Sequence, residues 1–286
     1  MRPISGPEGL ATAVVGIDQL DGGEISRTHT FELASERGRA EVRLDLFDSE
    51  VFERSIWRLT NFVAETPAGY AALLELVIGA VSTDAAQLLC RTSAAHLPEV
   101  WALEAMGFQL VDAGVTFALR SSAQVATPAD SAITVRAATD DDLAALVPTM
   151  VELPWGGRLD ADPTYTVAQV REHRSRWLWN SHRGRANAFL VGVLDGVPAG
   201  YVTCVLDPNA ATGDIELVGT LPAFRRLGVA SCLVAHAVAW FASRVGTVSV
   251  RTQSTNAAAA RVYEKAGFTL QASDLTFRLP LCERPH

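Results

Sequence analysis

The segment TLPAFRRLGVAS, residues 220–231, places two arginines and a glycine between an apolar strand and an apolar helix. The first backbone N–H groups of a helix have no partner within the helix, and the helix dipole adds partial positive charge there. Gly228 and Ala230 have little or no side chain, so an anion can approach the backbone closely. Arg225 and Arg226 can add charge-assisted hydrogen bonds to a phosphate. The pattern predicts a pyrophosphate cradle, and the alternative is an ordinary basic helix start.

Two carboxylates precede the cradle on the strand GDIELVGT. Strand alternation predicts that four residues share one face: Asp214, Glu216, Val218 and Thr220. An amine must be neutral to attack a carbonyl carbon, so a nearby proton acceptor helps. Glu216 lies deeper in the strand and is the better candidate for this base, directly or through a water, with Asp214 as the second. The alternative for Glu216 is a strand-end carboxylate in solvent.

A polar residue and a tyrosine follow in NAAAARVYEKAGF. Asn256 is expected to cap a helix that Gly267 ends. Asn256 and Tyr263 are seven residues apart, so they share one face of that helix, two turns from each other. The alternative for Tyr263 is a half-buried aromatic with no chemical role.

Strands and helices mixed around one sheet must position these groups, which is the pattern of a mixed α/β fold. The segment ITVRAATDDDLAAL predicts a short strand, a cap at Thr139 or Asp140, and a helix. Asp195 and Gly196 predict the turn of a β-hairpin. Residues 229–245 are almost all apolar and predict a buried helix.

An internal repeat relates the two halves of the chain, because residues 90–119 align with residues 250–279 without a gap. Each copy predicts a strand, a helix, a glycine stop and a strand. The first copy has His96 in place of Asn256 and Leu103 in place of Tyr263. It also lacks a counterpart of FRRLGVA before the helix expected at residues 71–81. The first half therefore reads as the same fold without its chemistry.

Length and composition indicate the number of domains and the classes of partner. The 286 residues predict two domains, one over residues 1–130 that ends in a linker at 121–132, and one over residues 131–286. The net charge of −8 argues against nucleic acid as a partner. The chain shows neither a membrane span nor a signal peptide, which predicts a cytoplasmic protein. The four cysteines have no metal-ligand spacing, and three of them read as reduced core residues: Cys90, Cys204 and Cys232.

Together the motifs resemble those of the GNAT superfamily of acetyl-CoA-dependent N-acyltransferases. VGTLPAFRRLGVA resembles its pyrophosphate motif, and N-x6-Y-x-K-x-GF resembles its second cofactor motif. The similarity covers residues 133–279. The resemblance implies the GNAT fold, a mixed and mostly antiparallel sheet flanked by helices, here preceded by a partial, degenerate GNAT-like domain. It implies acetyl-CoA as co-substrate, no metal, a small-molecule amine as acceptor, and direct attack of the amine.

The resemblance also implies roles for individual residues. Backbone groups of Val218, Gly219 and Thr220 would bind the pantetheine arm, and Asn256 would bond it. The pyrophosphate would lie on Arg225, Arg226, Leu227, Gly228, Val229, Ala230 and Ser231. Tyr263 would protonate the departing thiolate, which fits a phenol pKa of about 10 against a thiol pKa of about 8.5. Backbone N–H groups near Val218 would stabilise the oxyanion.

Over its whole length the chain resembles bacterial amino-sugar-nucleotide acetyltransferases of the dTDP-fucosamine type, in which a partial copy also precedes a catalytic one. One departure is Glu53 after Phe52, where that family typically has glycine. The resemblance implies an amino sugar or nucleotide amino sugar as acceptor. An amine-bearing antibiotic or other small molecule is the alternative acceptor, and a non-catalytic acyl-CoA-binding sensor is the alternative of another class. A homodimer is left open as the assembly.

Residues 171–185 contain five arginines within an acidic protein. They predict the solvated face of an amphipathic helix whose tryptophans pack inward, with one or two arginines reaching the acceptor. The polar segment before this helix is expected to wall the acceptor site with Trp155, Asp160, Asp162 and Tyr165.

Overall fold

The computed structural model describes residues 11–19, 25–33, 38–81, 85–120, 132–207 and 211–281. The linker expected at 121–132 therefore lies outside the described residues, except for its last position. The chain divides into two compact units, one of Met1–Ala113 with Asp274–His286 and one of Gly114–Ser273. Within the described ranges, no helix is both long and apolar enough to cross a membrane.

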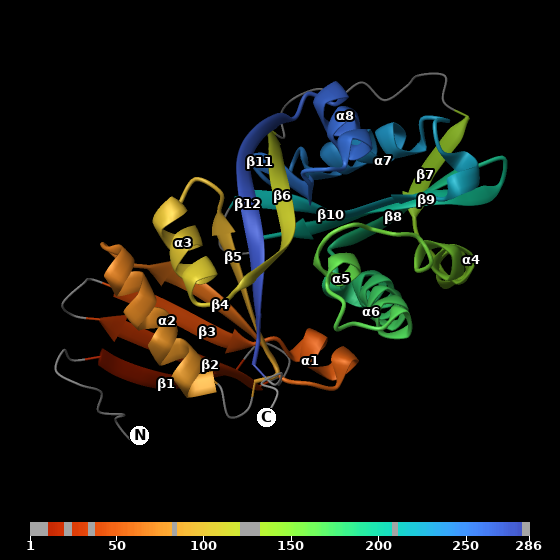
Figure 1. The fold of residues 1–286 in the computed structure, drawn as a ribbon. Helices are drawn as coiled ribbons and strands as arrows, with labels where there is room; N and C mark the ends of the chain where they lie inside the picture. Colours follow the sequence, from red (N-terminus) through yellow and green to blue (C-terminus); the bar gives the residue numbers. More distant parts are fainter. Residues whose placement is uncertain are drawn as a thin grey trace. The chain divides into compact units, whose positions relative to one another are not determined.

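The first unit is a sheet with helices packed on it (Figure 1). Its strands are β1 (Ala11–Gln19), β2 (Ile25–Leu33), β3 (Gly38–Leu44), β4 (Ile56–Val63) and β5 (Gln87–Ser93), followed in the sheet by the end of β12 (Thr269–Pro280). The strands pair antiparallel except for β4 and β5, which are parallel. Its helices are α1 (Leu46–Phe52), α2 (Pro67–Val81) and α3 (Leu97–Ala105).

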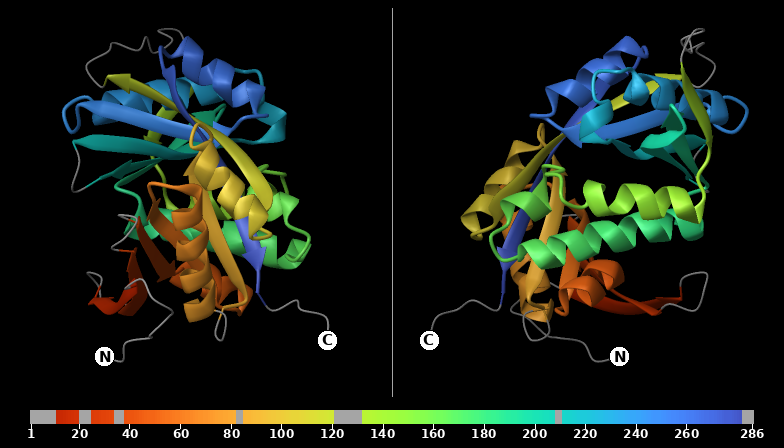
Figure 2. Two further views of the ribbon diagram at one scale, coloured as in Figure 1. Left: turned by 60° about the vertical axis from the view of Figure 1, so that its left-hand side comes forward. Right: turned by 90° about the vertical axis from the view of Figure 1, so that its right-hand side faces the viewer.

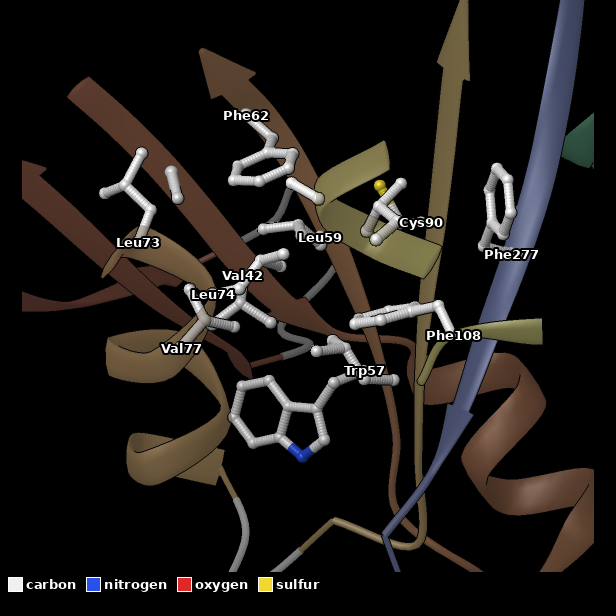
Figure 3. Packing of buried hydrophobic residues seen from close by; sticks show 14 of the residues in the cluster. Val42, Trp57, Leu59, Phe62, Leu73, Leu74, Val77, Cys90, Phe108 and Phe277 are labelled. Carbon is white, nitrogen blue, oxygen red and sulfur yellow. The ribbon is translucent and has the colours of Figure 1, made fainter. Parts of the chain in front are cut away.

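The core of this unit lies between α2, α3 and the sheet. Leu73, Leu74 and Val77 of α2 lie toward Val42 and Leu59 of the sheet (Figure 3). All five side chains are 2 % exposed or less, so α2 is held by apolar burial. Helix α2 begins at Pro67, earlier than the sequence predicted, because proline is favoured at the first position of a helix. Only residues 64–66 separate β4 from α2, which confirms that no counterpart of the cradle segment precedes this helix.

Helix α1 ends in a left-handed residue. Glu53, the residue after Phe52, has φ +52°. A left-handed backbone favours glycine, but a glutamate occupies this position here.

The second unit is a sheet covered on both faces by helices (Figure 2). Its strands run in the order β6 (Gln109–Arg120), β11 (Thr247–Gln253), β10 (Thr212–Thr220), β9 (Val197–Leu206), β8 (Ala188–Leu194) and β7 (Ile133–Ala137). Its helices are α4 (Asp140–Met150), α5 (Arg158–Ala161), α6 (Val167–Asn180), α7 (Val229–Phe241) and α8 (Ala257–Lys265). The hairpin predicted at Asp195 and Gly196 is confirmed, with φ +51° and +78° at the two turn residues.

Two apolar clusters hold the helices on the two faces of this sheet. Buried residues of α7, including Leu233 and Phe241, pack with Cys204 and Ile215 on one face. Buried residues of α4 and α6 pack with Tyr201 on the other face. Helix α7 is fully apolar on its buried side, as predicted, but it ends at Phe241 instead of residue 245, because the chain must turn before β11 begins.

The internal repeat is confirmed element by element. Strand β5, helix α3 and strand β6 lie 160 positions before β11, α8 and β12, with identical lengths in each pair. The glycine stops Gly107 and Gly267 have φ +84° and +89°. The three described cysteines, Cys90, Cys204 and Cys232, are free and buried, as predicted.

The last strands of the two copies are exchanged between the units. Strand β6 follows α3 of the first unit but pairs with β11 of the second, with Gly114 opposite Gln253. Strand β12 follows α8 of the second unit but pairs with β5 of the first, with Asp274 opposite Ser93. The compact units therefore differ from the division at residue 130 that the sequence predicts, since their boundaries fall inside β6 and β12.

Each exchanged strand brings its phenylalanine into the core of the unit that receives it. Phe117 of β6 is buried in the core of the second unit, and Phe277 of β12 is buried in the core of the first. The two positions are equivalent in the repeat, so the exchange is reciprocal in both hydrogen bonding and packing.

Helix α4 begins with a capping box that carries a charge. Thr139, one of the two predicted caps, accepts the N–H of Asp142, whose carboxylate accepts the N–H of Thr139 in return. Arg136 donates from Nη1 to Oδ2 of Asp142 at 2.5 Å and from Nη2 to Oδ1 at 2.9 Å. These bonds, led by those from Arg136, lower the pKa of Asp142 to about 2.

We expect Asp142→Asn to lower the free energy of unfolding at pH 7 by about 1 kcal/mol, the usual value of a helix cap. Because the folded pKa lies below the unfolded value of about 3.9, the stability that Asp142 contributes is present above pH 4 and is lost as the pH falls toward 2. Denaturant unfolding of wild type and variant between pH 7 and 2 measures this difference.

The matched control is Gln169, the uncharged partner in the capping box of α6 with Thr166. Gln169→Ala is expected to lower stability by a similar amount at every pH. An acid dependence that is the same in Asp142→Asn and wild type would contradict the assignment.

Candidate functional site

The parallel strands β10 and β11 separate at the centre of the second unit. They pair from Thr212 opposite Thr247 to Ile215 opposite Val250, and no pairing between them continues beyond that point in the described chain. Strand β10 continues along β9, and β11 continues along β6 to Gln253. The backbone edges that face each other beyond Ile215 are therefore left without strand partners, and a ligand can hydrogen-bond to them.

A bulge in β10 accompanies this separation. Ile215 lies opposite Cys204, but Val218 lies opposite Val202, so β10 has an additional residue between these pairs. Bulges bend a strand and increase its twist, which turns β10 away from β11. The N–H of Leu217 donates to Oγ1 of Thr203 at 3.0 Å within the bulge.

The bulge makes the prediction of one common face wrong. Ile215 and Val218 both pack against the cluster under α7. Asp214 precedes Ile215 and points to the opposite face, so Asp214 and Val218 lie on different faces. Strict alternation, on which the prediction rested, does not survive an inserted residue.

The two candidate carboxylates both have partners. Both oxygens of Glu216 accept hydrogen bonds from the guanidinium of Arg185, and the side chains are 23 % and 45 % exposed. Asp214 accepts a hydrogen bond from the hydroxyl of Ser249, which lies opposite it on β11. Glu216 is the first residue of β10 beyond the last pair with β11, so its ion pair lies where the strands begin to separate.

The predicted cradle lies at the start of α7. A short 3-10 turn, Pro222–Phe224, leads into it, and Arg226 and Gly228 have φ +65° and +86°. No hydrogen bond to the N–H groups of residues 226–231 forms within the described chain, and the first one is Cys232 N–H to Gly228 O at 3.0 Å. Arg225 and Arg226 are exposed. The segment therefore presents a run of unpartnered N–H donors beside two free cationic side chains.

The end of β10 has close backbone packing and one unpartnered hydroxyl. Oγ1 of Thr220 is buried and has no hydrogen-bond partner among the residues that the structure describes. A Cβ at Gly219 would lie 2.5 Å from Cε1 of Tyr201, so this glycine is required by packing as well as expected at the ligand. Thr220 and Gly219, with Val218, form the part of the separated edge nearest the cradle.

Helix α8 holds the other two candidate residues. Asn256 caps the helix, since its Oδ1 accepts the N–H of Ala259 at 3.1 Å and its Nδ2 donates to Oγ1 of Thr252 at 3.1 Å. Tyr263 is 5 % exposed and packs with Phe117 and Phe268, at ring-centroid distances of 6.0 and 6.1 Å. Burial raises the pKa of Tyr263 to about 12. The phenol is therefore protonated at every physiological pH, so it is available as a proton donor and not as a base.

Sequence reasoning did not assign the residues that connect α6 to the separated strands. Arg174 is buried and donates to Leu153 O at 2.9 Å and to Oδ1 of Asp160 at 2.5 Å. Its guanidinium lies 5.2 Å from the ring centre of Trp155, which lies 6.3 Å from that of Trp177. A series of contacts thus runs from Asp160 through Arg174 and Trp155 to Trp177.

The series ends at Arg185, whose guanidinium lies 5.6 Å from the ring centre of Trp177. Most of the five arginines in residues 171–185 were predicted to lie on a solvated face, with one or two reaching the acceptor. In the structure, Arg174 is internal and Arg185 binds Glu216. Asp162 and Tyr165, expected to wall the acceptor site, are themselves buried, at 3 % and 8 % exposure. The two tryptophans of RWLWN were the only sequence signal for these contacts. Their spacing did not show which arginine pairs with which carboxylate.

No group of three or more histidine, cysteine or carboxylate side chains is arranged to hold a metal ion within the described ranges. The titratable residues of the candidate site are Asp214 and Glu216 of β10, Tyr263 of α8, and Arg185.

One family model matches part of the chain. Residues 150–268 match the model of the acetyltransferase (GNAT) family. This segment contains β10, the cradle, α7 and the whole of α8 with Tyr263. A search among curated proteins found no match.

Solved structures resemble the chain over most of its length. A GCN5-related N-acetyltransferase from Sphaerobacter thermophilus has a TM-score of 0.64 at 17 % identity, covering 90 % of this chain and 81 % of that one. A tandem GNAT protein from the clavulanic acid biosynthesis pathway has a TM-score of 0.57 at 15 % identity, covering 91 % and 84 %. A glucosamine N-acetyltransferase region in a fungal β-N-acetylglucosaminidase has a TM-score of 0.60 at 10 % identity, covering 89 % and 33 %. At these identities the likeness establishes the fold, a mixed α/β sheet flanked by helices.

Proposed function

We propose that the chain transfers an acetyl group from acetyl-CoA to a primary amine by direct attack, because residues 150–268 match the model of the acetyltransferase (GNAT) family. The observation that carries the proposal is the separation of β10 and β11 beyond Ile215, beside a helix start whose N–H groups have no partner. An extended acyl-pantetheine chain can add to an open strand edge, and a diphosphate can bind unpartnered N–H groups.

The residues present fit such a co-substrate. The N–H groups of residues 226–231 and the exposed Arg225 and Arg226 are donors for a diphosphate. Oγ1 of Thr220 is a buried hydroxyl without a partner, of the kind that a ligand amide can satisfy. Val218 and Gly219 offer backbone groups along the separated edge. Acetyl-CoA supplies the acetyl group as a thioester.

In the proposed reaction, the amine nitrogen forms a bond to the carbonyl carbon and the carbon–sulfur bond breaks. Glu216, once released by Arg185, takes the proton that the amine loses, with Asp214 as the second candidate. Tyr263 gives its proton to the departing sulfur, for which its raised pKa keeps it protonated. Backbone N–H groups near Val218 stabilise the negative oxygen. Asn256 holds the start of α8, and with it the position of Tyr263.

For the acceptor we propose an amino sugar or a nucleotide-linked amino sugar. The whole-length resemblance of the chain to amino-sugar-nucleotide acetyltransferases supports this class, and so does a structural neighbour described as a glucosamine N-acetyltransferase region. An amine-bearing antibiotic is the second class of acceptor to test.

The experiment is a thiol-release assay with acetyl-CoA and a panel of free amino sugars, nucleotide-linked amino sugars and aminoglycosides, combined with calorimetric titration of coenzyme A. Binding of coenzyme A together with amine-dependent thiol release supports the proposal. Binding without release from any amine identifies the non-catalytic acyl-CoA sensor instead. Absence of binding at saturating coenzyme A contradicts both.

A further inference from the structure

The ion pair between Arg185 and Glu216 lies where β10 and β11 begin to separate. Arg185 ends the turn Ser181–Arg185, which follows α6 and is closed by the N–H of Ala186 donating to Ser181 O at 3.2 Å. Gly184 has φ +117° within this turn, so the chain leaves the helical path there. Here the turn brings the guanidinium to both oxygens of Glu216, the residue that follows the last β10–β11 pair.

The guanidinium of Arg185 packs near an aromatic side chain. It lies 5.6 Å from the ring centre of Trp177. Trp177 contacts Trp155, which in turn contacts the buried Arg174. A guanidinium presents a planar fork of N–H groups, and that fork matches the two oxygens of a carboxylate or phosphate. Arg185 is thus prearranged for a planar or tetrahedral oxyanion, and Glu216 supplies that oxyanion from within the chain.

The internal pair is one that a ligand can replace. Both side chains are partly exposed, and ion pairs of this kind contribute little net stability because water solvates the separated charges. A molecule that carries one anion and one ammonium group brings the complementary charges for both partners. Its anion pairs with Arg185 and its ammonium pairs with Glu216, so one internal ion pair becomes two across the site.

We propose that Arg185 binds an anionic group of the acceptor, so that the acceptor is an amine that also carries a phosphate or carboxylate, and that its arrival releases Glu216 to take the amine proton. This inference rests on the proposed function. It adds the substrate class to it, since a neutral amine leaves Glu216 bound to Arg185. The proton balance is that of the transfer described above, with Arg185 charged throughout.

Matched acceptors test the inference. Glucosamine is compared with glucosamine 6-phosphate, ethanolamine with phosphoethanolamine, and β-alanine amide with β-alanine, which separates phosphate from carboxylate as the anion. We expect kcat/KM of the wild type to be higher for the anionic member of at least one pair by about 10- to 100-fold, the effect of one charge-assisted bidentate contact. Arg185→Gln is expected to remove that preference by lowering kcat/KM for the anionic member only, and Arg185→Lys to keep part of it.

The control variant is Arg183→Gln, since Arg183 belongs to the same turn and stacks on Trp179, with 5.0 Å between guanidinium and ring centre. It is expected to keep the preference. A purely structural role of Arg185 would lower kcat/KM equally for neutral and anionic amines. That result, or equal use of both members by the wild type, overturns the inference and leaves the proposed function standing.

Glu216→Gln tests the second part of the inference. It removes both the internal partner of Arg185 and the carboxylate that takes the proton, so kcat for the anionic amine is expected to fall, while KM for the neutral amine stays unchanged. A calorimetric titration of the anionic amine into the protein saturated with coenzyme A requires no turnover. Equal binding by wild type and Arg185→Gln overturns the inference even if no amine is acetylated, an outcome that would count separately against the proposed function.

Discussion

Tyr263→Phe is expected to lower kcat by about 100-fold or more, the usual contribution of a positioned general acid, while the affinity for coenzyme A changes by less than about twofold. The phenol is buried among Phe117 and Phe268, so removal of one oxygen leaves the packing nearly unchanged. The substitution therefore removes the proton donor without opening a cavity. Steady-state kinetics with the best acceptor, together with calorimetry of coenzyme A, measure the two effects.

The pH dependence of this variant has a defined sign. Burial raises the pKa of Tyr263 to about 12, above the value of about 10 in the unfolded chain. The stability that the buried neutral phenol contributes is thus fully present below pH 10 and is lost as the pH rises toward 12. Tyr263→Phe is expected to retain stability over that interval, and the wild-type kcat should show no alkaline decline from Tyr263 below pH 10.

The control for Tyr263→Phe is Tyr70→Phe, the same chemical change at a tyrosine of the first unit that packs edge-on against Phe62. It should leave kcat unchanged. A kcat of Tyr263→Phe equal to that of wild type would remove Tyr263 from the mechanism, and Asn256 would then keep only its structural role as helix cap.

Gly228→Val is expected to weaken coenzyme A binding by about 10- to 100-fold, which corresponds to backbone strain of about 1–3 kcal/mol. Gly228 has φ +86°, a conformation that β-branched residues avoid. A Cβ there would meet no protein atom within 4 Å, so the cost comes from the backbone and from the space the anion would occupy. Relaxing that strain turns the N–H groups of the cradle away from a common ligand. Calorimetry of coenzyme A measures the loss.

Two further variants make the result specific. Gly196→Val places the same residue at φ +78° in the β8–β9 hairpin, again with open space around the Cβ, and should cost stability without changing coenzyme A affinity. Gly228→Asn, which tolerates a left-handed backbone, should bind more tightly than Gly228→Val. Wild-type affinity in Gly228→Val would contradict the assignment of residues 226–231 as the diphosphate site.

Much of the fold could be predicted from local signals. The Asp195-Gly196 turn, the Thr139 cap and the apolar run of α7 are encoded within a few residues each, and all three are confirmed. The repeat could be predicted because its two copies keep one register over an entire strand–helix–strand unit. The strand exchange could not, because a sequence repeat shows which segments are alike and not which copy each strand joins.

Some features of the candidate site could also be predicted from local sequence, and others could not. The helix start at residues 226–231 follows from local backbone physics, and the N-cap of Asn256 is local as well. The bulge in β10 depends on how β9 aligns with it, so alternation alone placed Val218 on the wrong face. The pairing of Arg185 with Glu216 joins residues that are distant in sequence and depends on the turn at Gly184. Such contacts are set by tertiary packing, which no short pattern encodes.

The reciprocal exchange of β6 and β12 has a consequence for how the chain matures on the ribosome. Until the final residues of β12 leave the exit tunnel, β5 has β4 on one side and a bare hydrogen-bonding edge on the other, and Phe277 has not yet closed its core. The first half can therefore complete its sheet only after β12 has been synthesised. A chain truncated before β12 would leave an unpaired strand edge in the half of the protein that was made first.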